Sequence, residues 1–119
     1  MDKYIMEELE ESLQIVSSTI SRCEKTQLKF VEGTSQHTLL KNRIKALHIS
    51  KSLISDENVV GLYTKEDFIE ALIPISSIIS KCEKAQQKHA EGTPYHTRFK
   101  KMIKAMYISK ALITEALEE

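Results

Sequence analysis

A chain of 119 residues with 17 basic and 17 acidic side chains has no net charge to draw it toward nucleic acid or a membrane surface. Its two cysteines are too few for a secreted disulfide framework, and no stretch approaches the roughly 20 apolar residues of a membrane span. We therefore expect a cytoplasmic protein without membrane association. Three glycines and two prolines favour long helices over many turns and strands.

The sequence contains one segment twice, at a constant offset of 59 positions. The run SSTISRCEK, which starts at Ser17, returns as SSIISKCEK from Ser76. About half of residues 7–56 match residues 66–115 identically, and the alignment needs no gap. This pattern indicates a tandem duplication with halves 1–57 and 62–119, joined by a linker over 55–63. Because each half is too small for a stable core of its own, we expect one domain over 1–119.

Apolar residues at steps of three and four predict a first helix from about residue 4 to residue 31. The row consists of Leu9, Leu13, Val16, Ile20 and Cys23, followed by Gln27 and Phe30. Small residues such as Ser12 and Thr19 run beside this row, and small side chains let a second helix approach closely. The first helix should therefore have two helical neighbours.

Gly33 followed by Thr34 predicts the turn between the first and second helices. Glycine readily takes the left-handed conformation that follows a helix, and threonine caps the helix that comes next. Gly92 and Thr93 repeat this pattern, and Pro94 adds a proline in the first turn, where it is favoured. We expect the second helix over 35–54 and the fourth over 94–117, so that each half forms an antiparallel hairpin.

The linker between the halves carries the apolar residues Val59, Val60 and Leu62. We therefore expect it to be packed against the helices. Thr64 and Asp67 then have the spacing of a capping box, which predicts the start of the third helix.

Pro74 interrupts the third helix at the position where the first helix has Ile15. Proline inside a helix removes one backbone hydrogen bond. We predict an all-α four-helix bundle of two tandem αα-hairpins related by a pseudo-twofold axis, with the third helix kinked or broken near Pro74. A domain-swapped or side-by-side homodimer is the main alternative, because a hairpin fused to its copy resembles half of a symmetric assembly.

Two Cys/His pairs with identical spacing could supply four zinc ligands: Cys23, His37, Cys82 and His96. At 1.5 Å per helical residue, the two ligands of one hairpin differ in level by roughly 9 Å. Only a pairing of one half's cysteine with the other half's histidine remains, and we expect no metal site and two reduced core cysteines. A disulfide between Cys23 and Cys82 would require Cα atoms within about 7 Å of each other.

No other set of residues supplies a nucleophile with its base, a glycine-rich phosphate loop or paired carboxylates in an apolar seam. We therefore predict that the protein is not an enzyme and binds no cofactor.

The second and fourth helices carry basic residues and, as far as residues 54 and 114, no acid. One stripe on each helix faces away from the predicted core, and the two stripes contain Lys41, Lys45 and His48 and their counterparts Lys100, Lys104 and Tyr107. Parallel basic stripes suit nucleic acid or another polyanion. Alternatively, the acids at the starts of the first and third helices lie beside these lysines in each hairpin and neutralise them.

We predict a non-enzymatic intracellular interaction module that binds a protein partner or self-associates. The alternative is a protein that binds nucleic acid or another polyanion through the two stripes. Polar residues retained in both halves fit either a shared use or a recent duplication.

Overall fold

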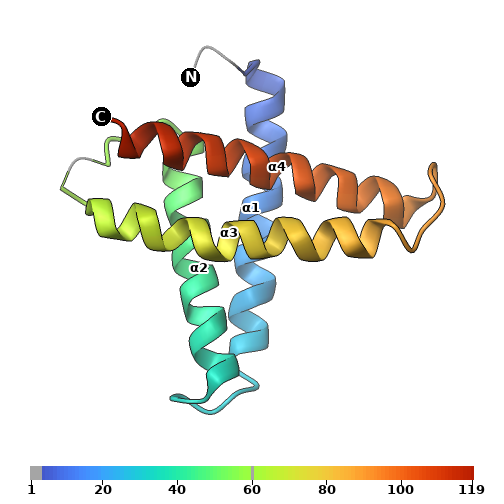
Figure 1. Cartoon of the computed structure of the whole chain (residues 1–119), viewed down its shortest axis with the longest axis horizontal. Coiled ribbons are helices and arrows are strands. Elements are labelled where there is room, and N and C mark those ends of the chain that lie inside the picture. Colours follow the sequence, from blue (N-terminus) through green and yellow to red (C-terminus); the bar gives the residue numbers. More distant parts are fainter. Residues whose placement is uncertain (1–3, 60) are drawn as a thin grey trace.

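The computed structural model describes residues 4–59 and 61–119, and over these residues it contains four helices and no strand. The helices are α1 (Met6–Gln27), α2 (Ser35–Ile54), α3 (Lys65–Gln86) and α4 (Pro94–Leu117). Figure 1 shows α1 beside α2, α3 beside α4, and the second pair lying across the first. The sequence prediction of an all-α bundle of four helices is confirmed.

The crossing produces a flat molecule of 43 × 41 × 19 Å. α2 and α4 meet where the pairs cross, α2 also packs on α3, and α4 packs on α1. No Cα atom of α1 lies within 8 Å of a Cα atom of α3. The loop-bearing end of each pair projects beyond the crossing (Figure 1), so α1 and α3 border an open inner corner.

One cluster of buried apolar side chains, drawn from all four helices, forms the core. Its largest fully buried members are Val16, Leu47, Ile49, Ile75, Met106 and Ile113. The predicted row on α1 is buried at its centre, whereas Phe30 lies beyond the helix and is exposed. α1 contacts both α2 and α4, so the prediction of two helical neighbours is confirmed.

Small residues are buried on α2 and α4, the helices that contact each other at the crossing. Ala46 and Ser50 on α2, with Ala105 and Ser109 on α4, are almost completely buried. Each serine Oγ donates a hydrogen bond to the carbonyl oxygen four residues earlier, at 3.0 Å in α2 and 2.9 Å in α4. Because these hydroxyls are satisfied within their own helices, their burial leaves no unpaired donor.

The predicted cap residues begin α2 and α4. The Oγ1 atoms of Thr34 and Thr93 each accept a hydrogen bond, at 3.3 Å, from the backbone N–H three residues later. Gly33 and Gly92 have φ angles of 93° and 90°, the left-handed conformation that glycine favours. The preceding helices end six residues before these glycines, at Gln27 and Gln86, so the first helix is shorter than predicted.

The linker is packed only in part. Val59 and Tyr63 pack against the core, and the Tyr63 ring meets the Phe68 ring edge-on at 6.2 Å. Leu62 is 62% exposed, contrary to the prediction, and Val60 lies outside the described residues.

α3 runs through Pro74 without a break, so of the two outcomes predicted there, a kink or a break, the break is wrong. The carbonyl that loses its N–H partner belongs to Glu70, an exposed residue. Water can hydrogen-bond to a carbonyl on an exposed helix face, so the helix tolerates the proline.

Candidate functional site

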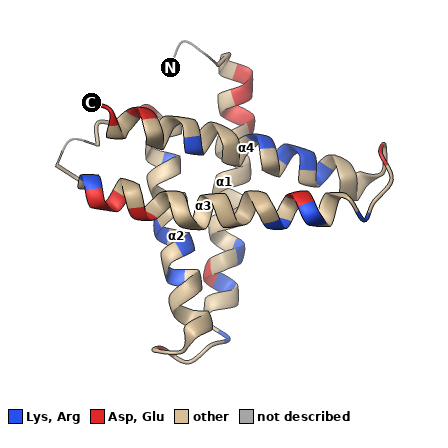
Figure 2. Ribbon diagram, in the orientation of Figure 1, with Lys and Arg blue, Asp and Glu red and all other residues tan. Residues whose placement is uncertain are grey.

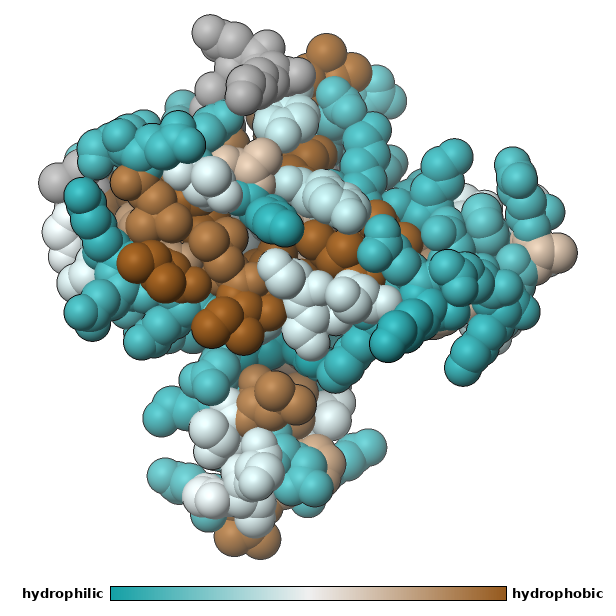
Figure 3. Space-filling model, in the orientation of Figure 1, coloured by the Kyte–Doolittle hydropathy of each residue, from teal (hydrophilic) through white to brown (hydrophobic). Residues whose placement is uncertain are grey.

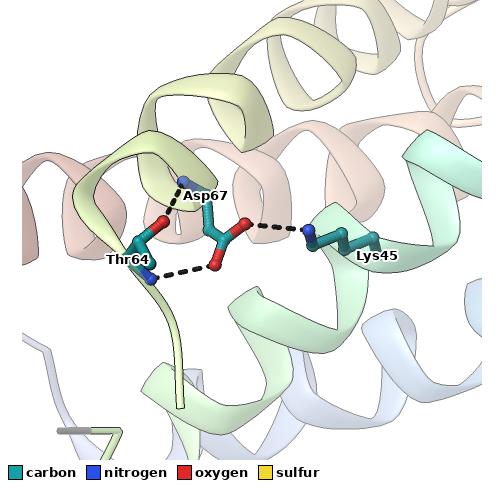
Figure 4. Close-up of polar contacts among 3 residues, drawn as sticks. All are labelled: Lys45, Thr64 and Asp67. Atoms are coloured by element: carbon teal, nitrogen blue, oxygen red, sulfur yellow. Dashed lines mark hydrogen bonds and ion pairs between the residues drawn. The ribbon is translucent and has the colours of Figure 1, made fainter. Parts of the chain in front are cut away.

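The side chain of Asp67 joins the second half of the chain to the first. One carboxylate oxygen contacts Lys45 Nζ on α2 at 2.8 Å, while the other accepts the Thr64 N–H at 2.9 Å. Thr64 Oγ1 in turn accepts the Asp67 N–H at 3.1 Å, which completes the predicted capping box (Figure 4). The first turn of α3 is therefore fixed to α2 by one carboxylate.

A second ion pair joins residues at the equivalent positions. Lys104 Nζ on α4 contacts Glu8 on α1 at 2.8 Å, and the Glu8 carboxylate also accepts the Ile5 N–H at 3.3 Å. Lysine neutralisation was predicted within each hairpin. These two lysines instead pair across the crossing, because the acidic first turns of α1 and α3 lie against the other pair of helices (Figure 2).

These contacts predict a pH-dependent stability. Hydrogen bonds from Lys104 and Ile5 lower the pKa of Glu8, and those from Lys45 and Thr64 lower the pKa of Asp67. A lowered folded-state pKa gives stability that is present above the unfolded-state value and is lost as the pH falls through the folded-state value. We therefore expect the unfolding temperature to fall when the pH is lowered past about 4. An Asp67→Asn, Glu8→Gln double variant should show a flatter pH profile; an unchanged profile would contradict this prediction.

The predicted basic stripes are exposed along their whole length, but some of their side chains already form ion pairs or hydrogen bonds within the chain. Lys45 and Lys104 form the ion pairs, and the Tyr107 hydroxyl donates to the Glu83 carboxylate at 3.4 Å. Lys41, Lys100 and His48 extend the exposed rows. Polyanion binding through the stripes therefore stays a prediction, and two of its four lysines already neutralise carboxylates.

The cysteines and histidines of the predicted pairs do not converge. Cys23 and Cys82 are buried free thiols, and their Cα atoms are more than 8 Å apart, which is too far for a disulfide. His37 and His96 instead lie in first helical turns, where their carbonyl oxygens accept hydrogen bonds. Across the described ranges, no three His, Cys, Asp or Glu side chains are grouped to hold a metal ion.

Gln27 and Gln86 have a role that the sequence analysis missed. The side-chain amide of each donates a 3.3 Å hydrogen bond to a histidine carbonyl, from Gln27 to His37 and from Gln86 to His96. The contact ties the end of one helix to the start of the next. The identical repetition of glutamine in both halves was the available signal.

An apolar surface lies at the corner where α2 meets α3. Leu39, Ile69 and Ile73 are 51%, 55% and 70% exposed. Leu39 and Ile73 line a groove of about 440 Å³, with Pro74 on the same wall. Figure 3 shows apolar side chains gathered over the first half of α3. We name Leu39, Ile69 and Ile73 the apolar corner.

The same positions in the other half have polar side chains. The offset of 59 relates Leu39 to Arg98, Ile69 to Glu10 and Ile73 to Gln14. Arg98 and Gln14 line a groove between α4 and α1, together with Arg22 and Lys101. We name Arg98, Glu10 and Gln14 the counterpart corner. Two surfaces built from equivalent positions therefore differ in chemistry.

The chain matches no family model, no curated protein and no solved structure. None of the helices in the described part of the chain is both long enough and apolar enough to cross a bilayer. Arguments about function therefore depend on the chemistry of the surfaces described above.

Proposed function

We propose that the protein is a non-enzymatic interaction module that self-associates through its apolar corner. The observation that carries the proposal is that the three exposed residues of the apolar corner are aliphatic, whereas the residues at the equivalent positions of the other half are polar. Leu39, Ile69 and Ile73 are more than half exposed, so they contribute little to the core of a single chain. Clustered exposed aliphatic side chains of this kind are typical of protein interfaces.

A second copy of the chain is the occupant that fits this surface best. Each chain has one apolar corner, and the counterpart corner carries charges that do not suit an apolar contact. An interface that uses the same patch on both partners closes after two copies. The expected assembly is therefore a twofold dimer in which the two apolar corners cover each other.

Substitution of the apolar corner by the residues of the counterpart corner tests the proposal. The triple variant Leu39→Arg, Ile69→Glu, Ile73→Gln gives α2 and α3 side chains that α4 and α1 already carry at the equivalent positions. Since all three sites are exposed, we expect an unchanged helical circular dichroism spectrum. Light scattering should give the mass of a dimer for the wild type and of a monomer for the variant.

The matched control is a triple alanine variant of the counterpart corner, Glu10→Ala, Gln14→Ala, Arg98→Ala, which should remain dimeric. A wild-type protein that stays monomeric at several hundred micromolar would contradict self-association, since specific interfaces of standard size hold at far lower concentrations. A dimer that survives the substitution of the apolar corner would show that another surface forms the interface.

We also infer that the two helix pairs are tandem antiparallel hairpins related by a pseudo-twofold axis. Support comes from interactions that recur at the offset of 59: two ion pairs, two threonine caps and two glutamine contacts. A kink near Pro74, one domain over 1–119 and a cytoplasmic location stay predictions. Nucleic acid or polyanion binding is the alternative function.

A further inference from the structure

The inner corner between α1 and α3 is a hollow with an unusual lining. No Cα atoms of the two helices lie within 8 Å of each other, and the space of about 330 Å³ between them reaches down to Cys23 and Cys82. Arg22 on α1, Arg43 on α2 and Lys81 on α3 line it, and no carboxylate does. Figure 2 shows basic residues on the stretches of α1 and α3 that border this corner.

The cations that line this hollow form no ion pair with the part of the chain that the structure describes. Among the described residues, none of Arg22, Arg43 and Lys81 forms an ion pair with a carboxylate. Arg43 makes a polar contact with the Cys23 thiol, and Arg22 Nη2 donates a 3.1 Å hydrogen bond to Thr19 Oγ1. This bond holds the Arg22 guanidinium beside the hollow, because the Thr19 hydroxyl is itself anchored to the Ile15 carbonyl at 2.7 Å.

Arg43 has a buried donor without an acceptor. Its Nε atom is inaccessible to solvent and has no hydrogen-bond partner among the described residues. A guanidinium is always protonated in proteins, so this N–H cannot be removed by titration. Buried donors are nearly always satisfied, and an unsatisfied one destabilises the fold. The folded chain therefore holds the Arg43 guanidinium at the hollow with its inner N–H unsatisfied, and a group that enters the hollow has the terminal Nη atoms to contact.

The thiols at the base of the hollow carry no charge that would repel an anion. Burial raises the pKa of Cys23 and Cys82, while the charges of Arg43 and Arg22 act in the opposite direction at both thiols. Both cysteines are therefore neutral thiols at pH 7. An anion that enters the hollow meets three cations and no negative group of the lining.

We propose that the inner corner binds a phosphate-type oxyanion between Arg22, Arg43 and Lys81. A phosphate group presents several acceptor oxygens, which suits two guanidinium groups and an ammonium on three different helices. Because the Nε of Arg43 is inaccessible, the anion would contact the terminal Nη groups of this guanidinium. The site differs from the basic stripes, whose lysines lie on the outer faces of α2 and α4, and it does not depend on self-association.

The chain supplies its own test substitution. The counterpart of Arg43 is Met102, a side chain of similar length without charge, so Arg43→Met places at this position a residue that the other half already has there. The wild type should show one saturable site when it is titrated with inorganic phosphate at constant ionic strength. Calorimetry and 31P NMR would measure the binding. Arg43→Met should weaken phosphate binding about tenfold or more, since hydrogen bonds to charged groups are the strong ones.

The control variant is Arg98→Met, which removes an exposed arginine outside the hollow and should leave phosphate binding unchanged. Without phosphate, Arg43→Met should melt no lower than the wild type, because it removes an unsatisfied buried donor. No saturable phosphate binding, equal affinity in Arg43→Met and wild type, or equal losses in both variants would each overturn the proposal. A free phosphate and a larger phosphate ester are distinguished by repeating the titration with phenyl phosphate.

Discussion

Enlarging Ala105 to leucine should destabilise the protein more than any surface change, because this residue lies where the two helix pairs cross. Ala105 is fully buried on α4, and Ala46 on α2 is 1% exposed at the equivalent position. Extra methylene groups in a packed site force shifts that cost about 1–3 kcal/mol, occasionally more. Because Ala105 has no exposed surface, an added branched side chain must displace the core atoms that surround it.

Urea denaturation followed by circular dichroism would measure the effect. We expect a loss of about 1–3 kcal/mol for Ala105→Leu and a larger loss when Ala46→Leu is added, since the two sites lie on helices that contact each other. Ala111→Leu is the matched control, as Ala111 is on the same helix but only partly buried. Equal stabilities of Ala105→Leu and Ala111→Leu would mean that the crossing can adjust to a larger residue without cost.

The helices could be predicted from the sequence because their start signals are local. Thr34, Thr93 and the Thr64 capping box mark the first residues of α2, α4 and α3, and each cap is formed in the structure. The end of α1 was placed too late, since Phe30 continues the apolar spacing although Gln27 ends the helix. A spacing pattern reports which face a residue would occupy, but not where the backbone leaves the helix.

The crossing was harder to predict because it depends on how the two helix pairs lie against each other. Ile49 and Ser50 are fully buried on α2 in addition to Leu47. α2 packs on three helices and therefore buries more than one stripe. The number of neighbours of a helix depends on how the pairs cross, which is a tertiary property that no local pattern encodes.

The candidate surfaces were missed for a related reason. The members of the apolar corner come from two helices, so no periodic pattern joins Leu39 to Ile69 and Ile73. A comparison of the halves position by position would have found them, because each is aliphatic where its counterpart is polar. The inner corner was equally hidden, since Arg22, Arg43 and Lys81 are contributed by three helices.

One substitution made at two positions of α2 separates the core from the proposed interface. Leu47 is fully buried, whereas Leu39, eight residues earlier, is 51% exposed at the apolar corner. Leu47→Ala should cost about 2–5 kcal/mol, because it leaves a cavity in the core. Leu39→Ala should change the stability of the monomer by no more than about 0.5 kcal/mol, as expected for a surface site.

For self-association we expect the opposite: Leu39→Ala should weaken dimerisation more than Leu47→Ala does. Denaturation at high dilution measures the monomer, since dimerisation adds apparent stability only at higher concentrations. At those higher concentrations, light scattering should show weaker dimerisation for Leu39→Ala, while the fraction of Leu47→Ala that remains folded should still dimerise. If Leu39→Ala lost as much monomer stability as Leu47→Ala, the apolar corner would belong to the core, and the proposed interface would lose its main support.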